Sequence, residues 1–313
     1  MNGSDPVRIL YLAGWGRSGS TILGALVGQA EGCFFGGELW YLGQRGWAQN
    51  YLCGCGKPFR ECEVWSEVTS RLRKELGDSA LTLLEALPGS TLRTRSLLMQ
   101  VLFGRMGIPS GLEQRTLDVL EKLYREIAAV SAASVIIDTS KAPMYGMLLE
   151  KIPSVQLSVV HLVRDPRGTG YSMRKRKYDP AGRRYLPRAG ALQNGVLWLT
   201  WNLAAEVLWN RRGSKTRYLR VRYEDFARNP DKGLRTVLDF LGLQSDLHLI
   251  SGPADVTLRA THSVSGNPDR MKTESIEIKI DDEWRSRMAW HQKGQAVLLT
   301  WPLLLRYSYR LWA

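Results

Sequence analysis

The 313-residue sequence lacks long apolar runs. No uninterrupted stretch reaches about 18 apolar residues, so a membrane-spanning helix is not expected. The first residues, MNGSDPVRILYLAG, also lack the basic start, the long apolar centre and the small-residue cleavage site of a signal peptide. We therefore expect a cytoplasmic protein.

Cysteine and histidine are scarce, with four of each. Three cysteines lie in the stretch YLCGCGKPFREC, where a third cysteine follows C-x-C after seven residues. This is not a standard zinc-finger spacing, and no histidine is near in the sequence. Cytosolic disulfides are normally reduced. Structural zinc, a disulfide and free thiols stay open, but we favour free thiols and predict no metal site. The cysteines concerned are Cys33, Cys53, Cys55 and Cys62.

Acidic residues are outnumbered, 30 against 43 Lys and Arg, which gives a net charge of +13. The excess is concentrated between Arg164 and Arg217, where thirteen Lys and Arg face three Asp and Glu. Such a charge favours an anionic partner, namely nucleic acid, a membrane surface or a polyphosphorylated small molecule. A solvated basic surface is the alternative without function.

The hydrophobic pattern indicates alternating strands and helices. Short apolar runs predict strands over residues 7–13, 134–138, 155–163 and 217–221, while helical spacing appears at 20–28 and in several segments between 63 and 131. Strands separated by helices predict an α/β fold with a central parallel sheet flanked by helices. Because no repeat, linker or break in composition occurs, we expect one domain over residues 1–313. The Gly/Pro/Arg-rich stretch 178–190 predicts a long functional loop.

The stretch GWGRSGST (14–21) directly follows the first predicted strand. Gly14, Gly19 and Thr21 match the phosphate-binding pattern G-x-x-x-x-G-K-[ST], but Ser20 stands where that pattern has lysine. A glycine-rich turn between a strand and a helix directs backbone N–H groups and the helix dipole at an anion. Arg17 supplies the cation that the missing lysine would have given.

A nucleotide kinase would also need a magnesium site at the end of another strand. Asp138 and Asp165 end predicted strands, but both are flanked by cations. This arrangement favours metal-free group transfer from an anionic donor.

At this point the sequence resembles a known family. GWGRSGSTIL is similar to the 5′-phosphosulfate loop of sulfotransferases that use 3′-phosphoadenosine-5′-phosphosulfate (PAPS), with Arg17 at the cationic position. In that family an arginine and a later serine after another strand bind the 3′-phosphate, and HLVRDPRGTGYS supplies them as Arg164 and Ser172. The resemblance implies a P-loop-like fold, PAPS as donor, 3′-phosphoadenosine 5′-phosphate (PAP) as product, and no metal.

Later segments extend the resemblance. VRYEDFARNPDKGLRTVLDFLGL is similar to the segment whose tyrosine, here Tyr223, lies near the adenine, and THSVSGNPDR to the loop that closes over the nucleotide in bacterial and Golgi-type members. DDEWRSRM resembles the helix that follows. The resemblance is weak over 63–131, which we expect to be a helical insert on the acceptor side. The implied donor-binding residues are Gly16, Arg17, Ser18, Gly19, Ser20, Thr21, Arg164, Ser172, Tyr223, Ser263, Asn267 and Arg270.

Three residues are implied in catalysis. Arg17 and Lys141, which follows the second predicted strand in DTSKAP, would neutralise charge on the sulfuryl group and on the leaving phosphate. Glu38 in FFGGELWYL stands where glutamate-type members keep their general base. Its aromatic neighbours would desolvate it and raise its pKa. His262 is the alternative base, whereas His161, inside an apolar strand, is expected to be structural.

The predicted function is in-line, metal-free transfer of a sulfuryl group from PAPS to an acceptor. The acceptor is a hydroxyl group in first place, and an amine in second, of a small molecule, glycan or lipid. Two alternatives stay open. One is a P-loop-type nucleotide kinase, and the other is a basic nucleic-acid-binding protein that uses RKRK (174–177) and the plentiful aromatic residues.

Overall fold

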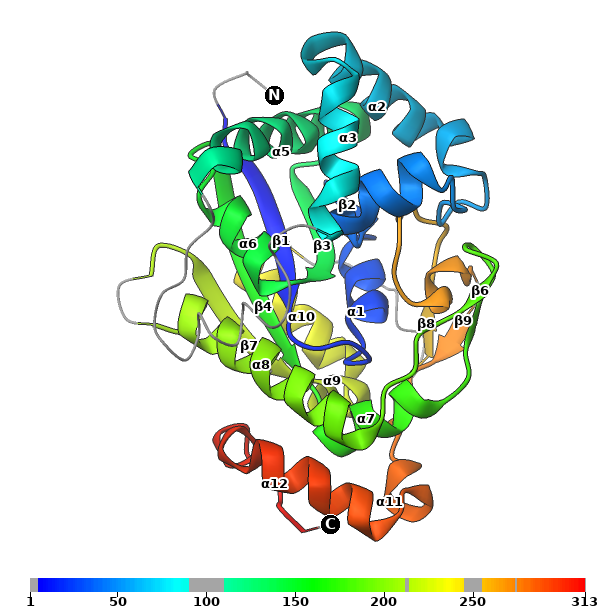
Figure 1. Ribbon diagram of the computed structural model, residues 1–313, viewed down its shortest axis with the longest axis vertical. Helices are drawn as coiled ribbons and strands as arrows, with labels where there is room; N and C mark the ends of the chain where they lie inside the picture. The colour runs from blue at the N-terminus through cyan, green and yellow to red at the C-terminus, as the bar shows by residue number, and fades with distance from the viewer. Residues whose placement is uncertain (1–4, 90–109, 212–213, 245–254, 274, 313) are drawn as a thin grey trace.

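The computed structural model describes residues 5–89, 110–211, 214–244, 255–273 and 275–312 (Figure 1). Its centre is a five-stranded sheet in the order β2-β3-β1-β4-β7. Every pairing in it is parallel. The strands are β1 (Val7–Ala13), β2 (Cys33–Gly37), β3 (Val135–Lys141), β4 (Val155–Val163) and β7 (Arg217–Arg222). The predicted α/β class with a central parallel sheet is confirmed.

Helices cover both faces of the sheet because its strands are apolar on both sides. Ile9 and Tyr11 of β1 pack into one core with α5 (Ser110–Ser131), α6 (Pro143–Glu150) and α8 (Ala191–Trp209). Leu10 and Leu12 face the other way, into a core with α1 (Ser20–Val27), α9 (Tyr223–Arg228) and α10 (Pro230–Leu241). The period-2 alternation along one strand therefore divides the interior into two layers.

The region between β2 and β3 contains the helices α2 (Glu63–Leu76), α3 (Asp78–Ala86) and α5. A further helix expected over 94–107 lies outside the described residues. Short helical turns connect these elements. They are η1 (Leu39–Tyr41), the π-helical η2 (Leu42–Ala48), η3 (Phe59–Glu61) and η4 (Leu87–Gly89).

The four predicted strands are present, but β2 was not anticipated. Its sequence CFFGG is five residues long and ends in two glycines, which carry no β-strand signal. It forms the edge of the sheet beside β3, with Phe34 paired to Ile136. This edge strand leads directly into Glu38.

The C-terminal half completes the fold. Helix α7 (Pro166–Arg174) follows β4, and α11 (Trp284–Arg287) and α12 (Trp290–Arg306) lie at the lower end of the view in Figure 1, where α12 packs against α8. Two hairpins, β5 (Tyr178–Asp179) with β6 (Arg184–Tyr185) and β8 (Asp255–Thr257) with β9 (Ser275–Glu277), flank the turn η5 (Pro268–Met271). In the described part of the chain, no helix has the length and apolarity needed to cross a membrane.

Candidate active site

The glycine-rich turn lies where β1 passes into α1. Gly14 has φ +117°, and a Cβ atom there would come 2.4 Å from the carbonyl oxygen of Leu162. Gly19, the N-cap of α1, has φ +89°, and its Cβ would meet the Tyr223 ring at 2.8 Å. Only glycine fits both positions. The turn therefore brings bare backbone amides to the N-terminus of α1, which suits an anion.

Two cavities meet at this turn. They share Arg17, Gly19, Ile22 and Asn267. The larger one, about 370 Å³, is called the acceptor-side cavity, after the role that the resemblance implies. The smaller one, about 270 Å³, is called the donor-side cavity. The acceptor-side cavity is further lined by Trp15, Gly16, Ser20, Thr21, Glu38, Tyr41, Arg45, Lys141, Met173, Leu186, Pro187, Arg188, Ala189, Gln193, Leu197 and Gly266. The donor-side cavity is further lined by Arg164, Ser172, Lys175, Lys177, Tyr223, Asp269 and Asp281.

Arg17 is a half-buried cation at the junction of the two cavities. Its guanidinium makes no hydrogen bond or ion pair with any residue that the structure describes, although it lines both cavities. Burial lowers the pKa of Arg17, while Asp269 and Glu38 act in the opposite direction. The residue has φ +65°, and Lys141 has φ +67°. Both cations are thus held in a strained left-handed conformation, which is found preferentially at functional sites.

Glu38 and Lys141 form an ion pair at the carboxyl ends of β2 and β3. The Lys141 Nζ atom lies 2.6 Å from Glu38 Oε1 and donates a second hydrogen bond of 2.6 Å to the carbonyl of Thr139. Arg45 lies on the other side of the carboxylate, 3.6 Å from Oε2. The sequence separates these groups, but the parallel sheet brings its strand ends to one edge.

The expected rise in the pKa of Glu38 is wrong. Burial does act in that direction, but the cations Lys141 and Arg45 outweigh it and hold the pKa below its usual value. The aromatic neighbours were visible in the sequence, whereas Arg45 and the direct contact with Lys141 were not. Glu38 is therefore an ionised carboxylate at neutral pH.

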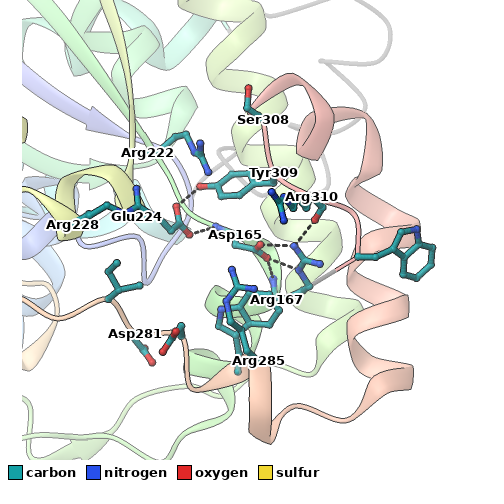
Figure 2. A pocket seen from close by; sticks show the side chains of 14 residues that line it. Asp165, Arg167, Arg222, Glu224, Arg228, Asp281, Arg285, Ser308, Tyr309 and Arg310 are labelled. Carbon is teal, nitrogen blue, oxygen red and sulfur yellow. Dashed lines mark hydrogen bonds and ion pairs between the residues drawn. The ribbon is translucent and has the colours of Figure 1, made fainter.

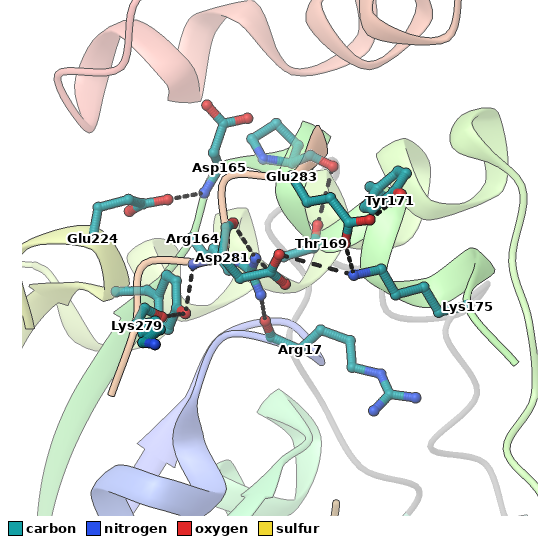
Figure 3. Close-up of polar contacts among 12 residues, drawn as sticks. Arg17, Arg164, Asp165, Thr169, Tyr171, Lys175, Glu224, Lys279, Asp281 and Glu283 are labelled. Carbon is teal, nitrogen blue, oxygen red and sulfur yellow. Dashed lines mark hydrogen bonds and ion pairs between the residues drawn. The ribbon is translucent and has the colours of Figure 1, made fainter. Parts of the chain in front are cut away.

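Arg164 follows β4 and joins three parts of the donor-side cavity (Figure 3). It donates to the Arg17 carbonyl at 2.9 Å and forms an ion pair with Asp281 at 3.0 Å. Its guanidinium also lies 4.4 Å from the centre of the Tyr223 ring. Figure 3 shows the Arg17 side chain extending away from this network, so only the Arg17 backbone is held by it.

The remaining donor-side residues come from α7 and the late segments. Ser172 lies one turn along α7 from Gly168, and Lys175 directly follows the helix, where it pairs with Glu283. Lys177 pairs with Asp269 at 2.8 Å. Sequence reasoning treated these lysines only as part of a basic run. Their position three and five residues after Ser172 was the available signal.

Three implied donor residues do not line either cavity. Ser263 is fully buried beside Thr261, and Arg270 donates to the carbonyls of Ser263 and Leu52 at 2.7 Å. Ser18 is buried, and its hydroxyl has no hydrogen-bond partner among the described residues.

The alternative base, His262, is also remote from both cavities. Its Nδ1 atom lies 3.2 Å from the Cys62 sulfur, and its ring stacks on Phe34. This contact corrects the reading that no histidine accompanies the cysteines, because His262 is distant only in sequence.

The strand-end carboxylates that a kinase interpretation would use are both engaged elsewhere. Asp138 accepts hydrogen bonds from Tyr124 at 2.5 Å and from the Ser140 amide at 2.7 Å, and burial raises its pKa to about 6. Asp165 caps α7 and pairs with Arg167 at 2.6 Å. His161 is fully buried inside β4, and this burial lowers its pKa to about 4.

A third cavity, about 380 Å³, shares Asp281 with the donor-side cavity (Figure 2). It is bordered by the C-terminal residues 308–312 and by the starts of α7 and α9. Its buried charges are already paired, Asp165 with Arg167 and Glu224 with the Tyr309 hydroxyl at 2.5 Å. None of the implied site residues lines it.

The wall of the acceptor-side cavity was predicted only in part. The loop over 178–190 was expected to be functional, and its residues 186–189 line the cavity. Tyr41 and Arg45, on η1 and η2, were missed because nothing in their local sequence marks them. Of the insert 63–131, none of the described residues lines either cavity.

Comparison with known proteins agrees with this geometry. The sulfotransferase family model matches residues 95–246. The sulfotransferase domain from the Synechococcus PCC 7002 olefin synthase aligns over 99% of this chain and 98% of its own, at 23% identity and a TM-score of 0.50. The sulfotransferase domain from the curacin biosynthetic pathway aligns over 97% and 98%, at 19% identity and a TM-score of 0.53. No curated protein sequence matches the chain significantly. Residues 95–246 thus match the sulfotransferase family model, and nearly the whole chain is similar in fold to two sulfotransferase domains.

Proposed function

We propose that the chain transfers a sulfuryl group from PAPS to an acceptor hydroxyl. The observation that carries the proposal is the half-buried guanidinium of Arg17, which has no partner among the described residues and lies at the junction of two cavities. A buried cation is costly unless an anion compensates it. An anionic group bound at this junction would be accessible from a donor in one cavity and from an acceptor in the other. Transfer between a donor and an acceptor requires this arrangement.

The donor-side cavity suits a nucleotide with phosphate at both ends. Among the described residues that line it, Arg17, Arg164, Lys175 and Lys177 are cationic, against Asp269 and Asp281. Arg17 and the α1 amides would bind the 5′ end, while Arg164 and Ser172 would bind the 3′-phosphate, with guanidinium geometry matched to phosphate oxygens. The Tyr223 ring, which closes the cavity beside Gly19, would stack on the adenine.

PAPS, when bound, supplies an activated sulfuryl group on a phosphate leaving group. Glu38 would accept the proton of the acceptor hydroxyl as that oxygen forms its bond to sulfur. Lys141, within 2.6 Å of the same carboxylate, would turn from it toward the sulfuryl oxygens, and Arg17 would neutralise the departing phosphate. Fixed cations thus take the part that magnesium plays in phosphoryl transfer.

The acceptor-side cavity favours an amphipathic acceptor. Trp15, Tyr41, Met173 and Leu197 give it an apolar wall, and Arg188 adds a cation. Such a lining suits a hydroxyl on a partly apolar small molecule, glycan or lipid.

Nucleotide discrimination tests the proposal. We expect PAP to raise the melting temperature strongly, ATP with magnesium weakly, and oligonucleotides only at low salt. Labelled PAPS should then lose its sulfuryl group to a member of a panel of hydroxyl acceptors with magnesium omitted. Stronger stabilisation by ATP–magnesium than by PAP would favour the kinase interpretation, and salt-resistant oligonucleotide binding would favour the nucleic-acid interpretation.

A further inference from the structure

The three cysteines of the CGCGKPFREC stretch meet His262 in space. The Cys53, Cys55 and Cys62 sulfurs and one ring nitrogen of His262 all lie within 4.8 Å of one another. These residues come from two segments about 200 positions apart. We propose that the four side chains bind one zinc ion as a structural Cys3His site, which is separate from the catalytic centre.

The distances suit tetrahedral coordination. With Zn–S bonds of about 2.3 Å and Zn–N bonds of about 2.0 Å, tetrahedral ligand atoms are about 3.5–3.8 Å apart. The His262 Nδ1 atom is already 3.2 Å from the Cys62 sulfur, and the largest separation is 4.8 Å. Movements of about 1 Å or less therefore complete the site. Binding zinc would release the three thiol protons, because the thiolates are the ligands.

The backbone is shaped to bring the ligands together. The Cys53 amide donates to the Lys57 carbonyl at 2.8 Å, which closes a tight turn around Cys55. Gly54, between the two cysteines, donates to the Ser263 carbonyl at 2.9 Å. A Cβ atom there would lie 2.5 Å from the Ser263 hydroxyl, so only glycine allows this close approach.

The other two proposed ligands, Cys62 and His262, are positioned by α2. Cys62 is the N-cap residue of the 14-residue α2, whose positive end stabilises a thiolate. The His262 carbonyl accepts a 2.6 Å hydrogen bond from the Trp65 indole of the same helix, which anchors the histidine to α2.

Burial and charge agree with a structural metal. Cys53 and Cys62 are fully buried, whereas Cys55 and His262 are half-buried and leave a path for the ion. Three thiolates, a neutral imidazole and Zn²⁺ carry a net charge of −1. The buried Arg270 guanidinium, 2.7 Å from the carbonyl of Leu52, lies next to this turn and balances that charge.

A disulfide explains the arrangement less well. It would join two of the three cysteines and would give the third cysteine and His262 no role. It would also leave the Leu52–Cys62 turn without a covalent link to the 261–263 segment. The zinc ion joins the two segments directly.

Metal analysis of the purified full chain tests the site. We expect one zinc per chain by elemental analysis, and cobalt substitution should give the visible absorption of tetrahedral thiolate coordination. Cys62→Ser should lose the metal, while the matched control Cys33→Ser, outside the cluster, should keep it. If Cys62→Ser fails to fold, Cys55→Ser at a half-buried position should lower zinc affinity. His262→Cys should keep the metal and shift the cobalt spectrum.

Three results would overturn the proposal. One is a reduced, folded chain that binds neither zinc nor cobalt after growth with added zinc and after reconstitution. The second is a zinc content that none of the cluster substitutions changes. The third is a disulfide between two of the cluster cysteines, found by mass spectrometry of non-reduced peptides. None of these results depends on sulfotransfer activity, so the zinc site and the proposed function stand or fall separately.

Discussion

The proposed base, Glu38, and the proposed cation, Lys141, have their side-chain atoms 2.6 Å apart. Glu38→Gln keeps the shape of the side chain but removes the base. We expect the chemical step to fall about 100-fold to 10,000-fold, the usual contribution of a general base. Donor affinity should change by less than about twofold, because Glu38 lines the acceptor-side cavity only. Single-turnover rates and PAP titrations measure the two quantities. A turnover per folded molecule close to that of the unmodified chain would remove Glu38 from catalysis.

The lowered pKa of Glu38 predicts how activity and stability depend on pH. The pKa of Glu38 lies below the usual carboxyl value of 4.5, so Glu38 stays ionised to a lower pH than an ordinary glutamate. We expect no acid limb from Glu38 in kcat/KM above about pH 5. The stability that the ion pair gives is complete above the usual pKa and is lost as the pH falls through the lowered folded value.

Lys141→Met tests whether Lys141 lowers the pKa of Glu38. Without this cation, burial of Glu38 is opposed mainly by Arg45, so the pKa of the carboxylate rises. The residual activity should then show an acid limb at a higher pH than in the unmodified chain. An unchanged limb would mean that another group controls the profile.

Substitutions of Arg164 and of Asp281 should change the affinity for PAP in opposite directions. Arg164→Ala should weaken PAP binding by about 2 kcal/mol, or about 30-fold, because a charge-assisted phosphate contact is lost. Asp281→Asn should strengthen PAP binding, since its carboxylate competes for Arg164 at 3.0 Å and would repel phosphate. Calorimetric titration measures both. Adenosine 5′-phosphosulfate, which lacks the 3′-phosphate, is the control, and equal losses for both nucleotides with Arg164→Ala would contradict the assignment.

At the level of elements, the end of β2 is the junction between the sheet and the late loop. The Glu38 amide donates to the Ser265 carbonyl at 3.1 Å, and Gly37 has φ +77°. A Cβ atom at Gly37 would lie 2.7 Å from that carbonyl oxygen. Gly37→Ala should therefore lower the free energy of unfolding by about 2 kcal/mol or more and also slow catalysis.

Gly294→Ala is the control for this substitution. Gly294 lies inside α12 with open space around it, and alanine there should raise stability by about 0.5–1 kcal/mol without changing turnover. Thermal unfolding compares the two variants. If Gly37→Ala were as well tolerated as Gly294→Ala, the junction would not constrain the site.

The elements differ in how far the sequence predicts them. Strands rich in valine and leucine, such as VQLSVVHLV, were identified with correct ends, because burial on both faces leaves a mostly apolar run. The edge strand β2 and the turns η1 and η2 carry no periodic signal, and they supply Glu38, Tyr41 and Arg45. The turns that carry a sequence motif were therefore predictable. The edge strand and the short turns that supply Glu38, Tyr41 and Arg45 were not.

At the scale of the whole molecule, the site depends on contacts between distant segments. Arg17 and Arg164 were predictable because each follows a strand in a recognisable motif. The contact of His262 with Cys62 was not, since the two residues are separated by 200 positions and no local pattern links them. For the same reason the lowered pKa of Glu38, which depends on a strand pairing and on a helical turn, was predicted with the wrong sign.

The late position of His262, Asn267 and Asp281 has a consequence for synthesis of the chain. All five strands of the sheet have left the ribosome once Arg222 has emerged, so the sheet can form before these residues exist. A nascent chain at that stage already contains Arg17, Glu38 and Lys141, but the Ser265 carbonyl that accepts from the Glu38 amide, the wall contributed by Asn267 and the partner of Arg164 are still to come. The proposed site can therefore be completed only after every strand of the sheet has been made.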